Sequence, residues 1–203
     1  MSFTQIRWTV LISLVVLMVF GAESSLTAWQ LDAPWLGGLS LPRMLTCHTL
    51  HWSWNHLAWD LVVFLVLGAL CERRDQSRFL LTLAAGAVLI PVGIGWLQPE
   101  IVRYRGLSGI DSALFGLLAT GLCRERSREG DRAGAWLMGL FLLGLMGKIG
   151  LECLRGGNLF VQDSTFVPLP WAHAIGGLVG TMAAIIDLPA TSPGLIRDAA
   201  CSE

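Results

Sequence analysis

The sequence predicts an all-α membrane protein with six transmembrane helices. Of its 203 residues, 54% are hydrophobic and only 14% are charged, and the mean hydropathy is +0.61. A soluble domain carries about 25% charged residues. Six apolar segments approach the ~20 residues needed to cross a bilayer, and arginines gather in the loops between them. The net charge of -1 gives no reason to expect a nucleic-acid partner.

The predicted spans are roughly 8–28, 54–71, 79–97, 107–123, 135–154 and 170–187. The first resembles a signal peptide, but no small-residue cleavage site and soluble domain follow it, so we expect it to be retained. Residues 1–188 are predicted to form one membrane domain. Residues 189–203 are polar and are predicted to form a short, disordered cytoplasmic tail.

The arginines predict the orientation. Nine lie at the termini and in two loops on one side, and four lie on the other. The nine are Arg7, Arg73, Arg74, Arg78, Arg124, Arg126, Arg128, Arg132 and Arg197. Because positive residues favour the cytoplasm, both termini are predicted to be cytoplasmic. The second, fourth and sixth helices then begin on the outer face, with Asn55, Ser108 and His173 at those beginnings.

Ser108 is the candidate nucleophile. It lies between Gly106 and Gly109, where a loop enters the fourth span. Glycines permit a tight turn and the close approach of a substrate carbonyl. The amino end of a helix adds free N–H groups. Amide hydrolysis needs a nucleophile, a base and donors for the oxyanion.

His173 is the candidate base, at the start of the sixth span. Gly176 and Gly180 follow it and predict backbone-close packing against a neighbouring helix. If that neighbour is the fourth span, His173 reaches Ser108. His51 and Asn55 are four residues apart, which predicts one helical face and a shared role as oxyanion donors.

These motifs resemble the rhomboid family of intramembrane serine proteases. The family motifs are His-x-x-x-Asn, Gly-x-Ser-Gly and Ala-His-x-x-Gly-x-x-x-Gly, in that order. Here they correspond to His51/Asn55, Gly106/Ser108/Gly109 and Ala172/His173/Gly176/Gly180. The resemblance implies a six-helix rhomboid-like bundle and a Ser108–His173 dyad, with His51, Asn55 and the Ser108 N–H binding the oxyanion. It implies no cofactor, and substrates that are transmembrane proteins in the lipid bilayer.

Within the family, the chain resembles the rhombosortases in its small core, in Asn55-His56-Leu57 and in the run that ends with Arg74. The resemblance implies a bacterial inner-membrane enzyme with its site facing the periplasm. Such an enzyme removes a C-terminal Gly-Gly-containing sorting tail from exported proteins.

The chain departs from the family four residues after the serine. Many rhomboids have an aromatic residue or His there, packed against the catalytic His, whereas this chain has Ser112, preceded by Asp111. A carboxyl group inside a membrane helix is usually functional. We therefore expect Asp111 or Ser112 to hydrogen-bond to His173 and orient its ring. The alternative is that Asp111 is a protonated packing residue.

Other functions fit the sequence less well than proteolysis. A catalytically inactive relative that escorts membrane clients is the main alternative, although the intact Ser108 and His173 argue against it. A transporter would need more intramembrane charges and internal repeats. His48, His51, His56 and Asp60 raise a metal site, but no HExxH motif is present and none is predicted. Lys148 and Glu152 are expected to neutralise each other.

Overall fold

The computed structural model describes residues 5–22, 30–32, 41–101, 103–155 and 169–187. The elements follow in chain order: α1 (Arg7–Gly21), β1 (Leu31–Asp32), α2 (Leu41–Thr46), the 3-10 helix η4 (Cys47–Thr49), α3 (Trp54–Arg74), α4 (Gln76–Leu97), β2 (Arg103–Tyr104), α5 (Ser108–Arg128), α6 (Arg132–Arg155) and α7 (Pro170–Ile185). The strands β1 and β2 pair antiparallel. The predicted tail lies outside the described residues.

The six long helices coincide with the six predicted spans. The first ends at Gly21 instead of residue 28, and residues 23–29 lie outside the described part. Three helices, α3, α4 and α6, are long and apolar enough to cross a membrane, so this is a membrane protein. Of the others, α1 and α7 are shorter, and α5 is less apolar. The count of six spans therefore stays a prediction.

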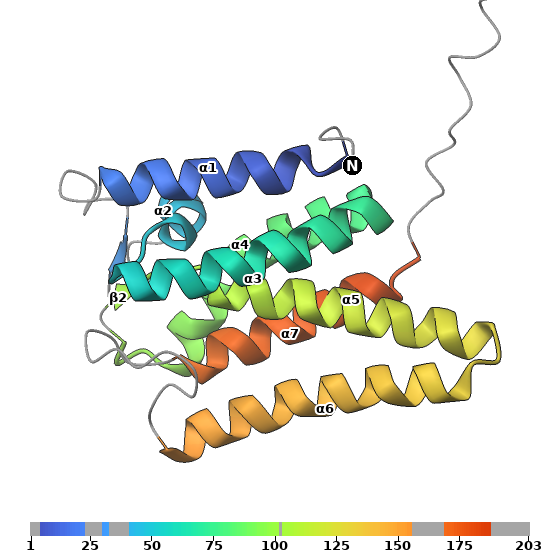
Figure 1. The fold of residues 1–203 in the computed structure, drawn as a ribbon. Helices are drawn as coiled ribbons and strands as arrows, with labels where there is room; N and C mark the ends of the chain where they lie inside the picture. Colours follow the sequence, from blue (N-terminus) through green and yellow to red (C-terminus); the bar gives the residue numbers. More distant parts are fainter. Residues whose placement is uncertain (1–4, 23–29, 33–40, 102, 156–168, 188–203) are drawn as a thin grey trace, which may run out of the picture.

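The central pair of helices is α5 and α7, which lie side by side in Figure 1 with α3 and α4 on one side and α6 on the other. Most of the first half of α5 is buried, and so is more than half of α7. In contrast, only Ile149 and Glu152 are buried on α6. The weak hydropathy of α5 comes from its last turns, which carry Arg124, Glu125, Arg126 and Arg128 and are not buried.

Glycines bring the backbones of α5 and α7 into contact. A Cβ atom added to Gly176 would overlap the carbonyl oxygen of Gly109, and one added to Gly180 would overlap that of Ala113. On the facing helix, a Cβ on Gly116 would overlap the carbonyl oxygen of Gly177. Small residues permit this approach in membrane helices. The predicted close packing of the sixth span therefore occurs, and its partner is the fourth.

A buried carboxylate attaches α1 to the bundle. Glu72, near the end of α3, accepts hydrogen bonds from the N–H groups of Trp8 (3.0 Å) and Thr9 (2.8 Å) and from the Thr9 hydroxyl (2.7 Å). These N–H groups belong to the first turn of α1 and have no partner within that helix. Glu72 therefore caps α1 from a neighbouring helix.

Candidate active site

Ser108 is the first residue of α5, directly after a sharp turn. Gly106 has φ +120°, in the left-handed region that favours glycine. A Cβ atom there would also lie 3.0 Å from the Cε1 and Nε2 atoms of the His56 ring. Gly106 is therefore required both by its backbone conformation and by the space available. The turn delivers Ser108 to the amino end of α5.

Ser108 is half-buried at this end. Its carbonyl oxygen accepts a hydrogen bond from the Ser112 hydroxyl at 3.0 Å. The first N–H groups of a helix have no partner inside it, so the first turn of α5 presents donors beside the serine. Within the described residues, the Ser108 hydroxyl makes no hydrogen bond to another side chain.

His173 lies in the first turn of α7 and is only 7% exposed. A Cβ atom on Gly109 would lie 3.3 Å from the carbonyl oxygen of Ala172, so Ser108 and His173 adjoin a contact between the two helices. No hydrogen bond joins their side chains in the described part of the chain. Catalytic hydrogen bonds are often long before substrate binds.

Two charged side chains of α6 contact the Nδ1 atom of the His173 ring. Its Nδ1 lies 2.8 Å from Glu152 Oε2 and 3.1 Å from Lys148 Nζ. Lys148 Nζ also donates to Glu152 Oε1 at 2.8 Å. The predicted Lys148–Glu152 pair thus exists, but it is not isolated, because both members contact His173. Sequence spacing showed the pair and gave no signal for its partner on α7.

Asp111 and Ser112 are placed differently from their predicted positions beside His173. The Ser112 hydroxyl bonds the backbone one turn earlier, which is a common bond for a helical serine. Asp111 is buried, and its Oδ1 has no hydrogen-bond partner in the described residues. Neither side chain bonds to His173 there. The carboxylate beside His173 therefore comes from α6 and not from α5.

His51 and Asn55 do not share a helical face. Ser53 caps α3, accepting from His56 N at 3.2 Å, so His51 precedes the helix and Asn55 lies in its first turn. His51 is completely buried and its Nε2 lies 3.3 Å from Asp60 Oδ2. Asn55 is exposed, and its side chain makes no hydrogen bond in the described region. The four-residue spacing failed as a guide because the helix begins between the two residues.

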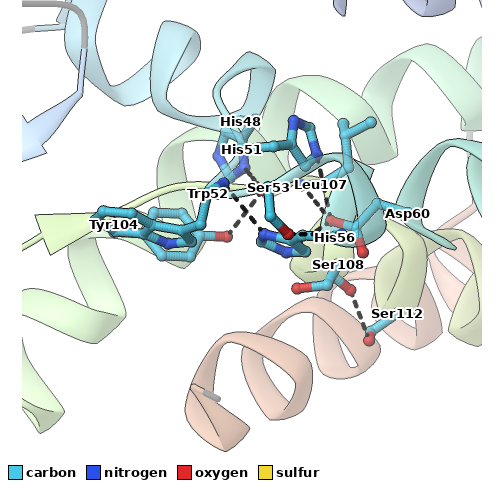
Figure 2. Close-up of polar contacts among 11 residues, drawn as sticks. His48, His51, Trp52, Ser53, His56, Asp60, Tyr104, Leu107, Ser108 and Ser112 are labelled. Carbon is cyan, nitrogen blue, oxygen red and sulfur yellow. Dashed lines mark hydrogen bonds and ion pairs between the residues drawn. The ribbon is translucent and has the colours of Figure 1, made fainter. Parts of the chain in front are cut away.

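His56 and Asp60, also four residues apart, do share a face of α3. Both are buried on α3, with His56 Nε2 at 3.2 Å from Asp60 Oδ2. The same oxygen accepts the backbone N–H of Leu107 at 3.0 Å. Figure 2 shows His51 and His56 both pointing at Asp60, next to Leu107 and Ser108. The signal in the sequence is this His-x-x-x-Asp spacing, five residues after His51, which by itself suggests only a metal site.

His48 and Tyr104 support the turn from the opposite side. His48 Nδ1 lies 3.3 Å from the carbonyl oxygen of Gly106, and its Nε2 lies 3.4 Å from that of Ala87. The Tyr104 ring meets His48 edge-on, with centroids 5.4 Å apart. Burial lowers the pKa of His48 to about 4, so the ring is neutral at pH 7 and holds one N–H to donate.

The chain matches a known protein-family model. The Rhomboid domain family model covers residues 38–190, which is more than half of the chain and contains every site residue described above. A search of curated proteins found no match. Rhomboids are serine proteases that act on transmembrane substrates inside the membrane. The chain belongs to the rhomboid family.

Proposed function

We propose that this protein is a serine endopeptidase that cleaves a membrane-anchored protein near its transmembrane segment. The observation that carries the proposal is the backbone contact of α5 with α7, which sets Ser108 beside the helix turn that bears His173. A nucleophile and a base on two helices in contact form the minimum apparatus for acyl transfer. Family membership supports the same reaction.

The proposed reaction uses His173 Nε2 as the base, because Nδ1 is occupied by α6. Ser108 Oγ attacks the peptide carbonyl as its proton passes to Nε2. The tetrahedral intermediate collapses when His173 returns the proton to the leaving amine, which breaks the C–N bond. Water, deprotonated by His173, then attacks the ester and releases a carboxylic acid and free Ser108.

The structure gives different degrees of support to the groups proposed as oxyanion donors. The Ser108 N–H belongs to the first turn of α5, where N–H groups lack helical partners. His51 is turned towards Asp60, and Asn55 is exposed. His56 borders the turn before Ser108, within 3.0 Å of a Cβ built on Gly106. The Nε2 atom of His56 is turned towards Asp60 as well, at 3.2 Å, so these contacts favour the Ser108 N–H over His51, Asn55 and His56 as the oxyanion donor.

The direction of the helices supports the proposed topology. In Figure 1, α3, α5 and α7 run the same way and begin at one end of the bundle. Arginines lie in the last turns of α3 and α5, at the opposite end. By the positive-inside rule, the arginine-rich end is cytoplasmic and the site faces the periplasm of a bacterial inner membrane. Both termini are then cytoplasmic.

The substrate proposed is an exported protein with a C-terminal Gly-Gly-type sorting tail. Its support is the rhombosortase resemblance of the short core and of the residues around His56 and Arg74. Cleavage of an anchored reporter carrying that tail, beside a reporter in which both glycines are replaced by alanine, tests it. Equal cleavage of both reporters would be consistent with a protease but would exclude specificity for the Gly-Gly tail.

The nucleophile and base are tested with a fluorophosphonate probe on the detergent-purified full chain. Wild type should label, while Ser108→Ala and His173→Ala should not. Ser127→Ala is the matched control, since it removes a hydroxyl from the exposed, opposite end of the same helix and should label normally. An unlabelled wild type, beside a rhomboid protease that labels, would favour the inactive escort instead.

A further inference from the structure

We propose that Glu152 is a positioning residue for His173, so that the site works as a Ser108–His173–Glu152 triad with Lys148 bound to the carboxylate. The proposal rests on the proposed function, because it assigns a partner to the base used there. Neither the sequence motifs nor the family match points to α6. The proposal is based on the contacts of Glu152 and on the burial of its side chain.

The burial of Glu152 is unexpected for the helix that carries it. Helix α6 is apolar and largely exposed, as a helix facing lipid would be. Yet Glu152 is 2% exposed and is one of the two buried residues among its 24. A carboxylate inside a membrane protein is costly unless it is paired, and such residues are usually functional. The small part of α6 that is buried in the protein therefore includes this carboxylate.

The geometry resembles that of a carboxylate that orients a catalytic imidazole. Glu152 Oε2 lies 2.8 Å from His173 Nδ1, within hydrogen-bonding range. A carboxylate can only accept and an ammonium can only donate, and because the contact of Nδ1 with Glu152 is the shorter of the two, we assign the hydrogen to Nδ1. The neutral ring then has its lone pair on Nε2, which is the tautomer needed to take a proton from Ser108. The same contact stabilises the imidazolium that forms during the reaction.

Lys148 completes the arrangement from one turn earlier on α6. It donates to Glu152 Oε1 at 2.8 Å, so each carboxylate oxygen has one partner. Its Nζ also lies 3.1 Å from His173 Nδ1, and since Nδ1 donates to Glu152, this approach is not a second hydrogen bond. The Lys148 ammonium holds the Glu152 carboxylate in place, and its positive charge disfavours protonation of His173. Glu152 and Lys148 therefore act on the base in opposite directions.

Within the part of the chain that the structure describes, the charged groups on the other helices near α7 do not bind the His173 ring. On α5, the first-turn carboxylate is Asp111, which makes no hydrogen bond to His173 in the described residues. The titratable side chain of α4 is Arg78, which donates to the carbonyl oxygen of Ala183 near the end of α7. On α3, Asp60 faces His51 and His56. Among these elements, α6 supplies the groups that contact the ring.

The test uses the full chain in detergent and measures the initial labelling rate with the fluorophosphonate probe from pH 5 to 9. Glu152→Gln should reduce the rate at pH 7 by about 100-fold and move the acid limb of the profile to lower pH, because the imidazolium loses its counter-charge. Lys148→Met should move that limb to higher pH. Glu152→Asp should restore part of the rate.

Glu72→Gln is the matched control, since Glu72 is also a buried carboxylate but binds α1. It should lower thermal stability and leave the shape of the pH profile unchanged. If Glu152→Gln keeps the wild-type rate and profile, the triad is overturned while the dyad stands. If wild type does not label, or if Ser108→Ala labels like it, the proposed function fails and the triad with it. Should Glu152→Gln not fold, unchanged profiles in Glu152→Asp and Lys148→Met would overturn the triad.

Discussion

The carboxylate of Asp60 accepts a hydrogen bond from the backbone N–H of Leu107, with 3.0 Å between Oδ2 and N. Leu107 immediately precedes Ser108, so this bond ties the nucleophile's turn to α3. The same oxygen lies 3.3 Å from His51 Nε2 and 3.2 Å from His56 Nε2. One buried oxygen thus gathers groups from three segments of the chain.

Replacing Asp60 should therefore damage both stability and activity. Asp60→Ala removes the acceptor of the Leu107 N–H and the carboxylate that faces the buried His51 ring, and we expect a loss of about 3 kcal/mol in the free energy of unfolding. Asp60→Asn keeps one amide oxygen for Leu107 and should lose less than half as much. Chemical denaturation in detergent measures the difference.

The control for Asp60 is Asp75, an exposed carboxylate that caps α4 by accepting from Arg78 N at 2.9 Å. Asp75→Ala should cost about 1 kcal/mol and leave probe labelling intact. Equal effects of Asp60→Ala and Asp75→Ala would show that burial and the histidine partners add nothing.

The sequence predicted the helices well because apolar length is a local property. All six long helices, and the contact made by Gly176 and Gly180, follow from composition and spacing. It predicted the span ends less well, since α1 stops at Gly21. The sequence also did not show that α5 would be the central helix, which packs against α7, α6, α3 and α4.

The site was harder to predict because its side chains meet across helices. Spacing identified His51 and Asn55, yet it contained no sign that Ser53 would start the helix between them. The Lys148–Glu152 pair was recognised, but its distance to His173 depends on how α6 packs against α7. Spacing shows which residues of one helix share a face, but not which side chain of another helix they will meet.

Gly106 and Gly130 make a matched pair for backbone strain. Both have positive φ, +120° and +80°, but only Gly106 has atoms close to an added Cβ. Gly130→Ala should cost about 1 kcal/mol from its backbone conformation alone. Gly106→Ala should cost more and should abolish probe labelling, since the methyl group displaces the His56 ring. Equal stability losses, with labelling kept in both, would remove the steric argument for Gly106.

The α5–α7 contact predicts a strong effect of single methyl groups. Gly176→Ala and Gly180→Ala place a Cβ inside a carbonyl oxygen of α5, so the helices must separate and the Ser108–His173 geometry must be lost. Labelling should fall at least about 100-fold, given the sensitivity of catalysis to displacements near 1 Å. Gly121→Ala on α5 meets nothing within 4 Å and serves as the control. Normal labelling by Gly180→Ala would contradict the backbone contact.

His48 should make the fold sensitive to acid. Burial lowers its pKa to about 4, from the ordinary 6.5. Below pH 6.5 the unfolded chain binds a proton that the folded chain refuses, so stability falls as the pH drops towards 4. The full difference corresponds to about 3 kcal/mol. His48→Gln keeps a donor for Gly106 without titrating, and its midpoint of thermal unfolding should change less between pH 7 and pH 4 than that of wild type. Parallel curves for the two proteins would show that His48 is not the acid-sensitive group, because every other titratable side chain is common to both.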